Sequence, residues 1–349
     1  MLFRNAFVRS VVLIKPPCIV PSREIEARLA PVYERLKLSA GRLELMTGIR
    51  ERRFWESGMR PSVAAARAGE EALIRAGVAR DRIGCLVHAS VSRDYLEPAT
   101  ASLVHERLGL SGDVVTFDLT NACLGVLNGM AQAATMIDAG QIEAALVVSG
   151  ETAEPLYEAT VAKLLSDRKL DRFSLKRQFA SLTIGSAAAA VVVTRGGEGV
   201  SSVPGRRLLG GAAGTDSRAN RLCQADPAKA TPTGPIMDTD SESLLHAGCS
   251  LAARTWEKAK KALGWNNRTP DHIFTHQVGK AHAKLTFDML GLPAERDFPT
   301  VSFLGNTGSA ALPGALALGI RDLDIKPGAK LALLGIGSGL SCLSLGMEW

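Results

Sequence analysis

Short apolar runs alternate along this chain with longer stretches in which apolar residues recur every third or fourth position. Residues 7–14, 82–90 and 144–149 are short runs and predict strands, whereas the alanine-rich residues 62–76 predict a helix. Residues 181–195, with the sequence SLTIGSAAAAVVVTR, predict either a pair of strands or one strand preceded by a tight glycine turn. Strands that alternate with helices are typical of an α/β fold around a central sheet.

One stretch, residues 114–130 (VVTFDLTNACLGVLNGM), passes from a strand-like segment into a helix-like one through Cys123. A helix start carries unpaired backbone N–H groups and the positive end of the helix dipole, and both favour a thiolate. We therefore expect Cys123 to be a nucleophile with a pKa near neutrality, with a small core residue as the alternative. The helix that follows is predicted to be buried on every side, because its apolar positions surround it: Leu124, Val126, Leu127, Met130, Ala131, Ala134, Met136 and Ile137.

The chain changes character after residue 195. Residues 196–240 are rich in Gly, Pro, Ser, Asp and Arg without a sustained period, so we predict an irregular connection, and we hypothesise a loop or lid over a binding site. Residues 241–263 predict a helix capped by Asp240 or Ser241. The predicted organisation is therefore an N-terminal half over residues 1–195 and a C-terminal half over residues 241–349.

The order of elements in the first half recurs in the second, in residues 271–278, 301–320 and 331–334. In this repeat Asn306 stands where Cys123 stands in the first half, and each is predicted to lie at a strand-to-helix junction followed by small residues. His276 lies at the end of the adjoining strand. A pseudo-twofold relation between the halves would bring both junctions to the middle of one molecule.

Cys123, His276 and Asn306 make chemical sense as one site. Cys123 would attack an acyl thioester, and His276 and Asn306 would donate hydrogen bonds to the thioester oxygen of a second substrate. The backbone N–H groups of Cys123 and of a glycine-rich turn could form the oxyanion hole, the turn comprising Gly337, Ser338 and Gly339. Taken singly, His276 could be a satisfied core histidine and Asn306 an ordinary turn residue.

Composition fits a folded protein with a sizeable core, because 46% of the 349 residues are hydrophobic and 22% are charged. The six cysteines show neither CxxC pairing nor regular spacing, so we expect reduced thiols, a cytoplasmic location and no metal site. The apolar run at the N-terminus is too short for a membrane span and has no cleavage site of small residues.

The charge balance suits an anionic partner, with a net charge of +6 and a pI near 9.1. The basic residues are spread along the chain and aromatic residues amount to only 5%, which argues against a nucleic-acid partner. The densest basic cluster holds Arg50, Arg52 and Arg53, and it could bind the phosphates of CoA or an acidic carrier protein. A solvated loop is the alternative.

Other chemistries find little support. The segment GIGSGL at residues 335–340 lacks the third glycine of a dinucleotide-binding fingerprint, and no serine lies in a GxSxG elbow. There is no HExxH motif, and the spacing of His276 and His282 does not fit a pair of metal ligands. These observations count against dehydrogenase, serine hydrolase and metalloenzyme functions.

Five motifs together resemble condensing enzymes of the thiolase superfamily, of the ketoacyl synthase III type. They follow the order of that family along nearly the whole chain: TGIRERR (47–53), NAC (121–123), HQV (276–278), GNTGSA (305–310) and GIGSGLSC (335–342). The resemblance implies a duplicated αβαβα fold, a homodimer, no tightly bound cofactor, and catalytic roles for Cys123, His276 and Asn306.

Within this superfamily, SVSRDYLEPAT at residues 90–100 is similar to the OleA branch, which joins two long acyl-CoA chains without decarboxylation. The resemblance implies that Glu97 reaches across the dimer interface to remove the α-proton in the partner's active site. The chemistry agrees, since condensing two plain acyl chains requires a proton acceptor, whereas a decarboxylating synthase makes its carbanion by losing carbon dioxide. An isolated Glu before Pro would otherwise be a solvated loop residue.

In many ketoacyl synthase III relatives, a Trp and an Arg hold the CoA adenine. This sequence departs from them, because Arg42 and Met46 occupy those two positions. Three functions stay open at this point. The first is condensation of two acyl-CoAs to a β-keto acid for olefin biosynthesis, and the second is a decarboxylative 3-oxoacyl-ACP synthase III or a related acyltransferase. The third is a catalytically idle partner subunit that only binds acyl groups.

Overall fold

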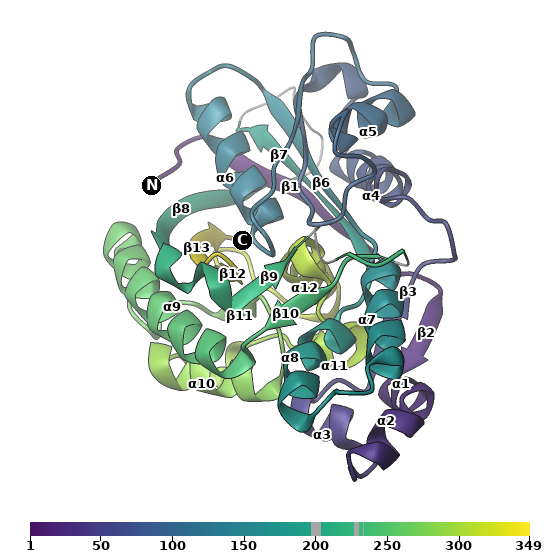
Figure 1. Cartoon of the computed structure of the whole chain (residues 1–349). Coiled ribbons are helices and arrows are strands. Elements are labelled where there is room, and N and C mark those ends of the chain that lie inside the picture. The colour runs from purple at the N-terminus through teal and green to yellow at the C-terminus, as the bar shows by residue number, and fades with distance from the viewer. Residues whose placement is uncertain (197–203, 227–229, 233) are drawn as a thin grey trace.

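The computed structural model of this chain describes residues 1–196, 204–226, 230–232 and 234–349. Nine strands form one continuous hydrogen-bonded sheet (Figure 1). The pairing of β1 with β8 joins two smaller sheets within it. The first sheet contains β1 (Ala6–Ile14), β4 (Ile83–His88), β5 (Val115–Asp118), β6 (Ala144–Glu151) and β7 (Ala187–Arg195). The second contains β8 (Arg206–Thr215), β11 (His272–Thr275), β12 (Lys330–Gly337) and β13 (Ser341–Glu348).

The two sheets repeat one pairing pattern. In the first, β4 is parallel to β6 while β7 is antiparallel to both β6 and β1. In the second, β11 is parallel to β12 while β13 is antiparallel to both β12 and β8. Even the parallel pairing of β4 with β5 has a counterpart, a single parallel bridge between Ile273 and Asp297. The repeat read from the sequence is therefore confirmed at the level of strand topology.

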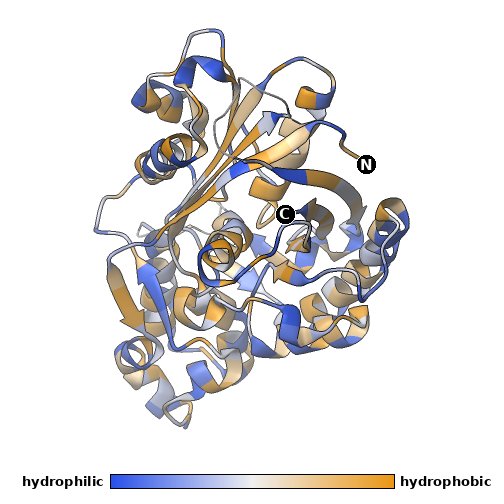
Figure 2. Ribbon diagram, turned by 180° about the vertical axis from the view of Figure 1, so that it is seen from behind, coloured by the Kyte–Doolittle hydropathy of each residue, from blue (hydrophilic) through white to orange (hydrophobic). Residues whose placement is uncertain are grey.

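Helices enclose and separate the sheets. The outer layers are formed chiefly by α4 (Pro61–Ala76) and α5 (Thr100–Leu108) on the first sheet and by α9 (Ser241–Leu263) and α10 (Lys280–Leu290) on the second. Between the sheets lie α6 (Gly125–Asp138) and α12 (Ala311–Asp322), whose apolar side chains share one core with strands of both sheets. Figure 2 shows that the long strands of the first sheet are predominantly apolar, whereas the helices around them are mixed. This arrangement confirms the predicted duplicated αβαβα fold.

Small residues allow the outer helix α4 to lie close against the first sheet. The helix carries six buried alanines, and a Cβ added to Gly150 of β6 would lie 2.1 Å from the backbone oxygen of Pro61. Alanine favours helix formation and occupies little space, so it suits a helix at such short range.

The remaining elements attach to this frame. One group packs beside the sheets at the lower right of Figure 1: β2 (Cys18–Pro21), α1 (Ser22–Arg28), α2 (Ala30–Arg35), α3 (Arg42–Thr47), β3 (Glu51–Phe54), α7 (Glu154–Ser166), α8 (Arg172–Thr183) and α11 (Val301–Leu304). Among the residues that the structure describes, the others are a two-stranded sheet and short 3₁₀ helices: β9 (Cys223–Ala225), β10 (Met237–Thr239), η1 (Arg80–Arg82), η2 (Ser217–Leu222), η4 (Ala294–Arg296) and η5 (Gly308–Ala310). Among the described residues, no helix is both long and apolar enough to cross a membrane.

Several strands and helices match the sequence predictions closely. The strands at 7–14, 82–90 and 144–149 are present as β1, β4 and β6, and residues 181–195 form one strand, β7, after a turn that contains Gly185. The helix predicted at 241–263 is α9, and its cap is Asp240, whose carboxylate accepts a hydrogen bond from Ser243 N at 3.1 Å. Local patterns and capping therefore determined these elements.

The prediction of an irregular connection over residues 196–240 is wrong in its main part. This segment contains the ten-residue strand β8 and the short strands β9 and β10, although residues 197–203, 227–229 and 233 lie outside the described structure. Strand β8 contains three glycines, two of them adjacent with positive φ, which hid its strand pattern. The boundaries of the two halves stay a prediction, but the second sheet begins with β8.

Two further predictions need correction. Residues 301–304 form a helical turn, α11, so Asn306 does not lie at a strand-to-helix junction. Helix α6 is not buried on every side, because Gln132 and Thr135 are exposed. Its buried face is the one that packs in the core between the sheets.

Candidate active site

Cys123 lies in a tight turn between β5 and α6. A backbone bridge links Asn121 to Cys123, and Ala122 between them has a φ of +45°, a conformation that residues with a side chain seldom adopt. Helix α6 begins at Gly125 with Leu124 as its N-cap, so Cys123 precedes the first helical residue by two positions. The sequence between β5 and α6 thus holds the thiol on a constrained turn.

The electrostatics of this turn differ from the expectation. The pKa of Cys123 is raised to about 12, chiefly because burial penalises the thiolate and secondarily because the charges of Glu151 and Cys223 oppose it. Only a backbone N–H lowers this pKa. The predicted resting thiolate is therefore wrong: desolvation outweighs the helix start, and Cys123 is a neutral thiol before substrate binds.

Asn306 lies in a loop that is hydrogen-bonded on both sides. Its backbone N–H donates to Thr183 O at 3.0 Å, and its backbone oxygen accepts from Gly185 N at 2.9 Å. Its side-chain Oδ1 accepts from Gly308 N at 3.2 Å, which leaves the amide Nδ2 as the donor of this side chain. The sequence Gly-Asn-Thr-Gly provides the sharp turns that this loop needs.

A direct contact joins the Asn306 loop to the Cys123 turn. Ser309 Oγ donates to Ala122 O at 2.6 Å, and a Cβ added to Gly125 would lie 2.8 Å from the same Ser309 Oγ. Residues nearly two hundred positions apart in the chain are thus held against each other by one hydroxyl, as the predicted duplication required.

His276 follows β11 and is connected to the Cys123 turn through β12. Its backbone N–H donates to Leu334 O of β12 at 2.9 Å. Where β12 ends, a Cβ added to Gly337 would lie 3.3 Å from Cys123 N. The end of β12 therefore lies against the thiol turn, as the predicted oxyanion hole of Cys123, Gly337, Ser338 and Gly339 requires.

The His276 side chain is buried, with 6% exposure, and burial lowers its pKa to about 3. A nearby second histidine, His282, lowers this pKa further. His276 is therefore a neutral imidazole at physiological pH, able to donate from one ring nitrogen and accept at the other. That the side chains of Cys123, His276 and Asn306 converge on one substrate stays a prediction.

The sequence analysis missed Glu151, the last residue of β6. Its side chain is 4% exposed, and it accepts hydrogen bonds of 3.0 Å from the backbone N–H groups of Val91, Ser92 and Ser309. The carboxylate thus ties the segment leading to Glu97 and the loop after Asn306 to the neighbourhood of Cys123. Hydrogen bonds to a charged group contribute roughly 1.5–3 kcal/mol each. The available signal was a glutamate that closes a strand whose first five residues are apolar.

Cys223 was also missed as a neighbour of the site. It lies on β9, accepts a hydrogen bond from Thr239 Oγ1 at 3.5 Å, and interacts with the Ser338 hydroxyl. Its charge is also one cause of the raised pKa of Cys123. The segment expected to form a loop or lid therefore contributes a strand beside the thiol.

Glu97 is not part of the site that one chain forms with its own residues. It is exposed, on a loop that also exposes the apolar side chains of Tyr95 and Leu96, the latter by 91%. Edge strand β5 adds Val115, which is 50% exposed. Glu97, Leu96 and Val115 are thus exposed in the single chain, whereas the Tyr95 hydroxyl accepts a hydrogen bond from Arg60.

The basic cluster divides into three different environments. Arg52 is fully buried and donates to Val20 O and Ser22 Oγ, with its pKa lowered to about 10 by desolvation. It therefore does not fit the predicted CoA or carrier site, because alternate residues of strand β3 point inward. Arg53 is partly buried and donates to Pro16 O, whereas Arg50 is exposed.

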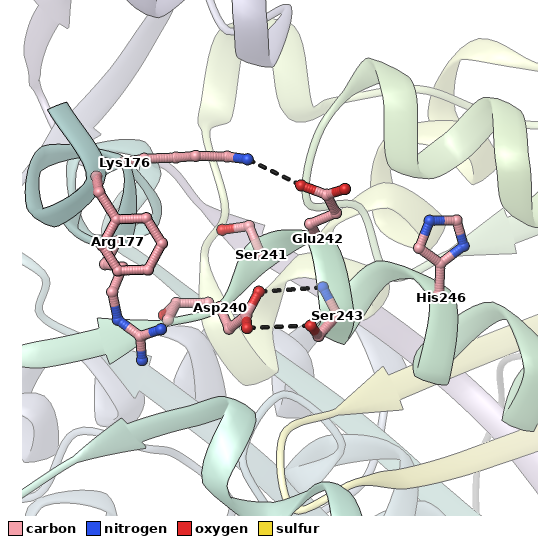
Figure 3. Close-up of a pocket in the computed structure, with 9 residues that line it drawn as sticks. Lys176, Arg177, Asp240, Ser241, Glu242, Ser243 and His246 are labelled. Carbon is pink, nitrogen blue, oxygen red and sulfur yellow. Dashed lines mark hydrogen bonds and ion pairs between the residues drawn. The ribbon is translucent and has the colours of Figure 1, made fainter.

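A surface pocket of about 350 Å³ lies between α8 and the start of α9 (Figure 3). Its cations are paired, Lys176 with Glu242 and Arg177 with Asp238. The pocket is connected to the site through Thr239, which lines it and donates to Cys223. In Figure 3 the imidazole of His246 stands apart from these pairs.

Comparison with known proteins agrees with this geometry. The sequence model of 3-oxoacyl-[acyl-carrier-protein] synthase III matches residues 117–208, and the model of that family's C-terminal part matches residues 261–349. The chain belongs to this family of thiolase-fold condensing enzymes and is an acyltransferase of the ketoacyl synthase III type.

Among its relatives are two proteins named acyl-CoA:acyl-CoA alkyltransferase. The protein of Shewanella oneidensis is 36% identical over 351 residues and that of Xanthomonas campestris 38% identical over 350, each covering 100% of both chains. A crystal structure of Xanthomonas campestris OleA with a Cys-to-Ala change has a TM-score of 0.94 at 36% identity, covering 100% of this chain and 98% of that one. Within the family, the chain thus resembles OleA proteins over its full length.

Proposed function

We propose that this protein condenses two long-chain fatty acyl-CoA thioesters head to head, without decarboxylation, and yields a β-keto acid for olefin or hydrocarbon biosynthesis. The observation that carries the proposal is the full-length likeness to two proteins named acyl-CoA:acyl-CoA alkyltransferase. The thiol turn, the docked Asn306 loop and the neutral His276 support it, since they fit the chemistry of a condensing enzyme.

In the first half-reaction, the Cys123 sulfur attacks the carbonyl carbon of one acyl-CoA. The carbon–sulfur bond to CoA breaks, and the thiol proton of Cys123 leaves with CoA as its own thiol. Because the resting thiol is neutral, proton transfer has to accompany the attack. The N–H groups of Cys123 and of the turn at Gly337, Ser338 and Gly339 would stabilise the oxyanion.

In the second half-reaction, Glu97 of a partner subunit removes the α-proton of a second acyl-CoA. His276 and Asn306 donate hydrogen bonds to its thioester oxygen and stabilise the enolate. The enolate carbon attacks the acyl group on Cys123 and releases the sulfur, which regains a proton from Glu97. Hydrolysis of the resulting β-ketoacyl-CoA by water then gives the β-keto acid and CoA.

The proposal includes a homodimer without a tightly bound cofactor, located in the cytoplasm. The exposed Leu96 and Tyr95 beside Glu97, and the exposed edge strand β5, support self-association at this face. The six cysteines are all free, which agrees with a reducing compartment. We retain Arg50 and Arg53, but not the buried Arg52, as candidates for contacts with CoA or a carrier protein.

A decarboxylative 3-oxoacyl-ACP synthase III is the second candidate. It is favoured by the two family matches and by a relative named beta-ketoacyl-[acyl-carrier-protein] synthase III in Cereibacter sphaeroides, which is 30% identical over 346 residues and 99% of both chains. Incubation with myristoyl-CoA alone distinguishes the two functions. A β-keto acid or its ketone breakdown product is expected, whereas a strict need for a malonyl thioester would establish the second candidate.

Glu97→Ala tests the base. We expect the acyl adduct on Cys123 to form normally, as seen by mass spectrometry, while condensation falls by about 10²–10⁴-fold. Mixing Glu97→Ala chains with Cys123→Ala chains should restore about a quarter of the wild-type activity, because half of the dimers would be mixed and each would have one intact site. Full condensation by the Glu97 variant, or no recovery on mixing, would contradict a base supplied across the interface.

A further inference from the structure

A small cavity lies behind His276, between the end of β11 and helix α10. Its volume is about 10 Å³, which is close to the space that one water molecule needs. It is lined by Thr275, His276, Gln277, Val278, His282, Ala283, Thr286 and Phe287. Two histidines, six positions apart and carried by different elements, thus face one small space.

The His276 ring presents an unpaired atom on its buried side. Its Nδ1 is buried and has no hydrogen-bond partner within the described parts of the chain. An unsatisfied polar atom in the interior costs about 1–3 kcal/mol, so such an atom at a site of chemistry calls for an explanation.

The other polar side chains around the cavity are committed elsewhere. Thr275 Oγ1 donates to Asp297 Oδ1 at 3.2 Å, and Thr286 Oγ1 donates to His282 O at 2.8 Å. The Gln277 amide donates to Phe298 O, while its oxygen accepts from Thr300 N and Val301 N. His282 is therefore the lining residue whose ring is left to supply a donor to Nδ1.

Charge does not oppose this arrangement. Burial lowers the pKa of His282 to about 4 and that of His276 to about 3, so both rings are neutral near pH 7. A neutral imidazole has one donor and one acceptor nitrogen, and the partner of one nitrogen decides which tautomer is present. If Nδ1 accepts a hydrogen bond, the ring proton resides on Nε2.

We propose that His282 is a positioning residue that, through one water molecule in this cavity, holds His276 in the tautomer with the proton on Nε2. The tautomer matters because, once Nδ1 accepts a hydrogen bond, the Nε2–H is the ring donor that remains for the thioester oxygen of the second acyl-CoA. That consequence rests on the proposed function, whereas the tautomer itself does not.

The first test reads the tautomer in the free enzyme. Selective ¹⁵N labelling gives signals for the six histidines, and His276→Asn identifies the signal of His276 by its loss. We expect the Nε2–H form in the wild-type protein and a shift toward the Nδ1–H form in His282→Ala. His282→Gln, which keeps a side-chain donor, should preserve the wild-type form. Lys284→Ala, at an exposed position of the same helix, is the matched control and should leave the signal unchanged.

The second test reads catalysis with myristoyl-CoA as substrate. His282→Ala should lower kcat for condensation by about 10–100-fold, the range known for partners that orient metal-bound imidazoles, with KM changed by less than about twofold and acylation of Cys123 retained. His282→Gln should recover most of the loss, although a purely structural role would not predict such a rescue. A wild-type His276 in the Nδ1–H form, or an unchanged tautomer in His282→Ala, would overturn the proposal even if condensation proceeds. A shifted tautomer without any condensation by the wild type would instead refute the proposed function alone.

Discussion

The connections that lead into α6 and α12 occupy equivalent places in the two halves, but they differ in conformation and in chemical groups. In the first half, β5 passes through the turn of Cys123 into α6, and the nearby Glu151 places an acid beside the thiol. In the second half, the connection into α12 runs through the helical turn α11 and the neutral Asn306. The first half therefore holds a thiol and a carboxylate, whereas the second holds the amide of Asn306 and the imidazole of His276, whose pKa is lowered by burial.

The repeated strand topology determines where the two loops meet, but it does not determine which side chains they contain. Strand pairing is the same in both sheets, so the ends of equivalent strands come together in the middle of the molecule. The contact between Ser309 and Ala122 is one of several points at which the two halves meet at the site. The two loops nevertheless differ in conformation and in the side chains they carry.

The largest effect should follow from removing the thiol of the first half. Cys123→Ala is expected to abolish the acyl adduct and to reduce turnover by more than about 10³-fold, because no other group replaces a covalent nucleophile. The neighbouring thiol offers a matched control, since Cys223→Ala should still form the adduct. Mass spectrometry after incubation with acyl-CoA measures both. An adduct on Cys223 in place of Cys123 would reverse the assignment.

A smaller loss is expected when the link between the halves is weakened at Glu151. Glu151→Ala leaves three backbone N–H groups without their acceptor, so the loops should shift and turnover should fall by roughly 10²-fold. Hydrogen exchange at residues 91, 92 and 309 measures the loosening directly. Glu143→Ala, which removes only a surface ion pair with Arg82, should change turnover by less than about twofold. Equal effects of the two variants would show that Glu151 does not act as such a link.

The smallest change concerns the protonation of Cys123. Because its pKa is raised far above 7, the thiolate fraction and the rate of alkylation by iodoacetamide should rise about tenfold per pH unit from pH 7 to 9. Peptide mass spectrometry measures the rate at Cys123. Glu151→Gln should raise that rate several-fold at constant pH, since it removes a negative charge near the sulfur. A plateau below pH 8 would instead support the resting thiolate expected from the sequence.

The sequence analysis succeeded where the information is local or periodic. Strands β1, β4 and β6 are nearly unbroken apolar runs, and α9 has both a sustained helical period and an aspartate cap. It failed at β8, where glycines interrupt the strand pattern, and at α11, where four residues are too few to show a period. Both failures lie where neighbouring strands and loops, rather than local preference, decide the conformation.

For the site, the sequence supplied the candidates and the fold decided their environments. Motif and order pointed to Cys123, His276 and Asn306, but only packing reveals that Arg52 is buried or that the charge of Glu151 helps to raise the pKa of Cys123. Burial also reversed the predicted ionisation of Cys123, because desolvation depends on every residue that surrounds the sulfur. Neither effect is visible in a short segment.

The sequence by itself determined the duplicated α/β frame, because the alternation and order of apolar segments specify which elements form and how often the pattern repeats. The tertiary structure alone decided the raised pKa of the Cys123 thiol, the burial of Arg52 and the cavity that His276 and His282 share. The physical reason is distance: periodicity acts over a few residues of chain, whereas charge, desolvation and shared cavities depend on residues that only folding brings together.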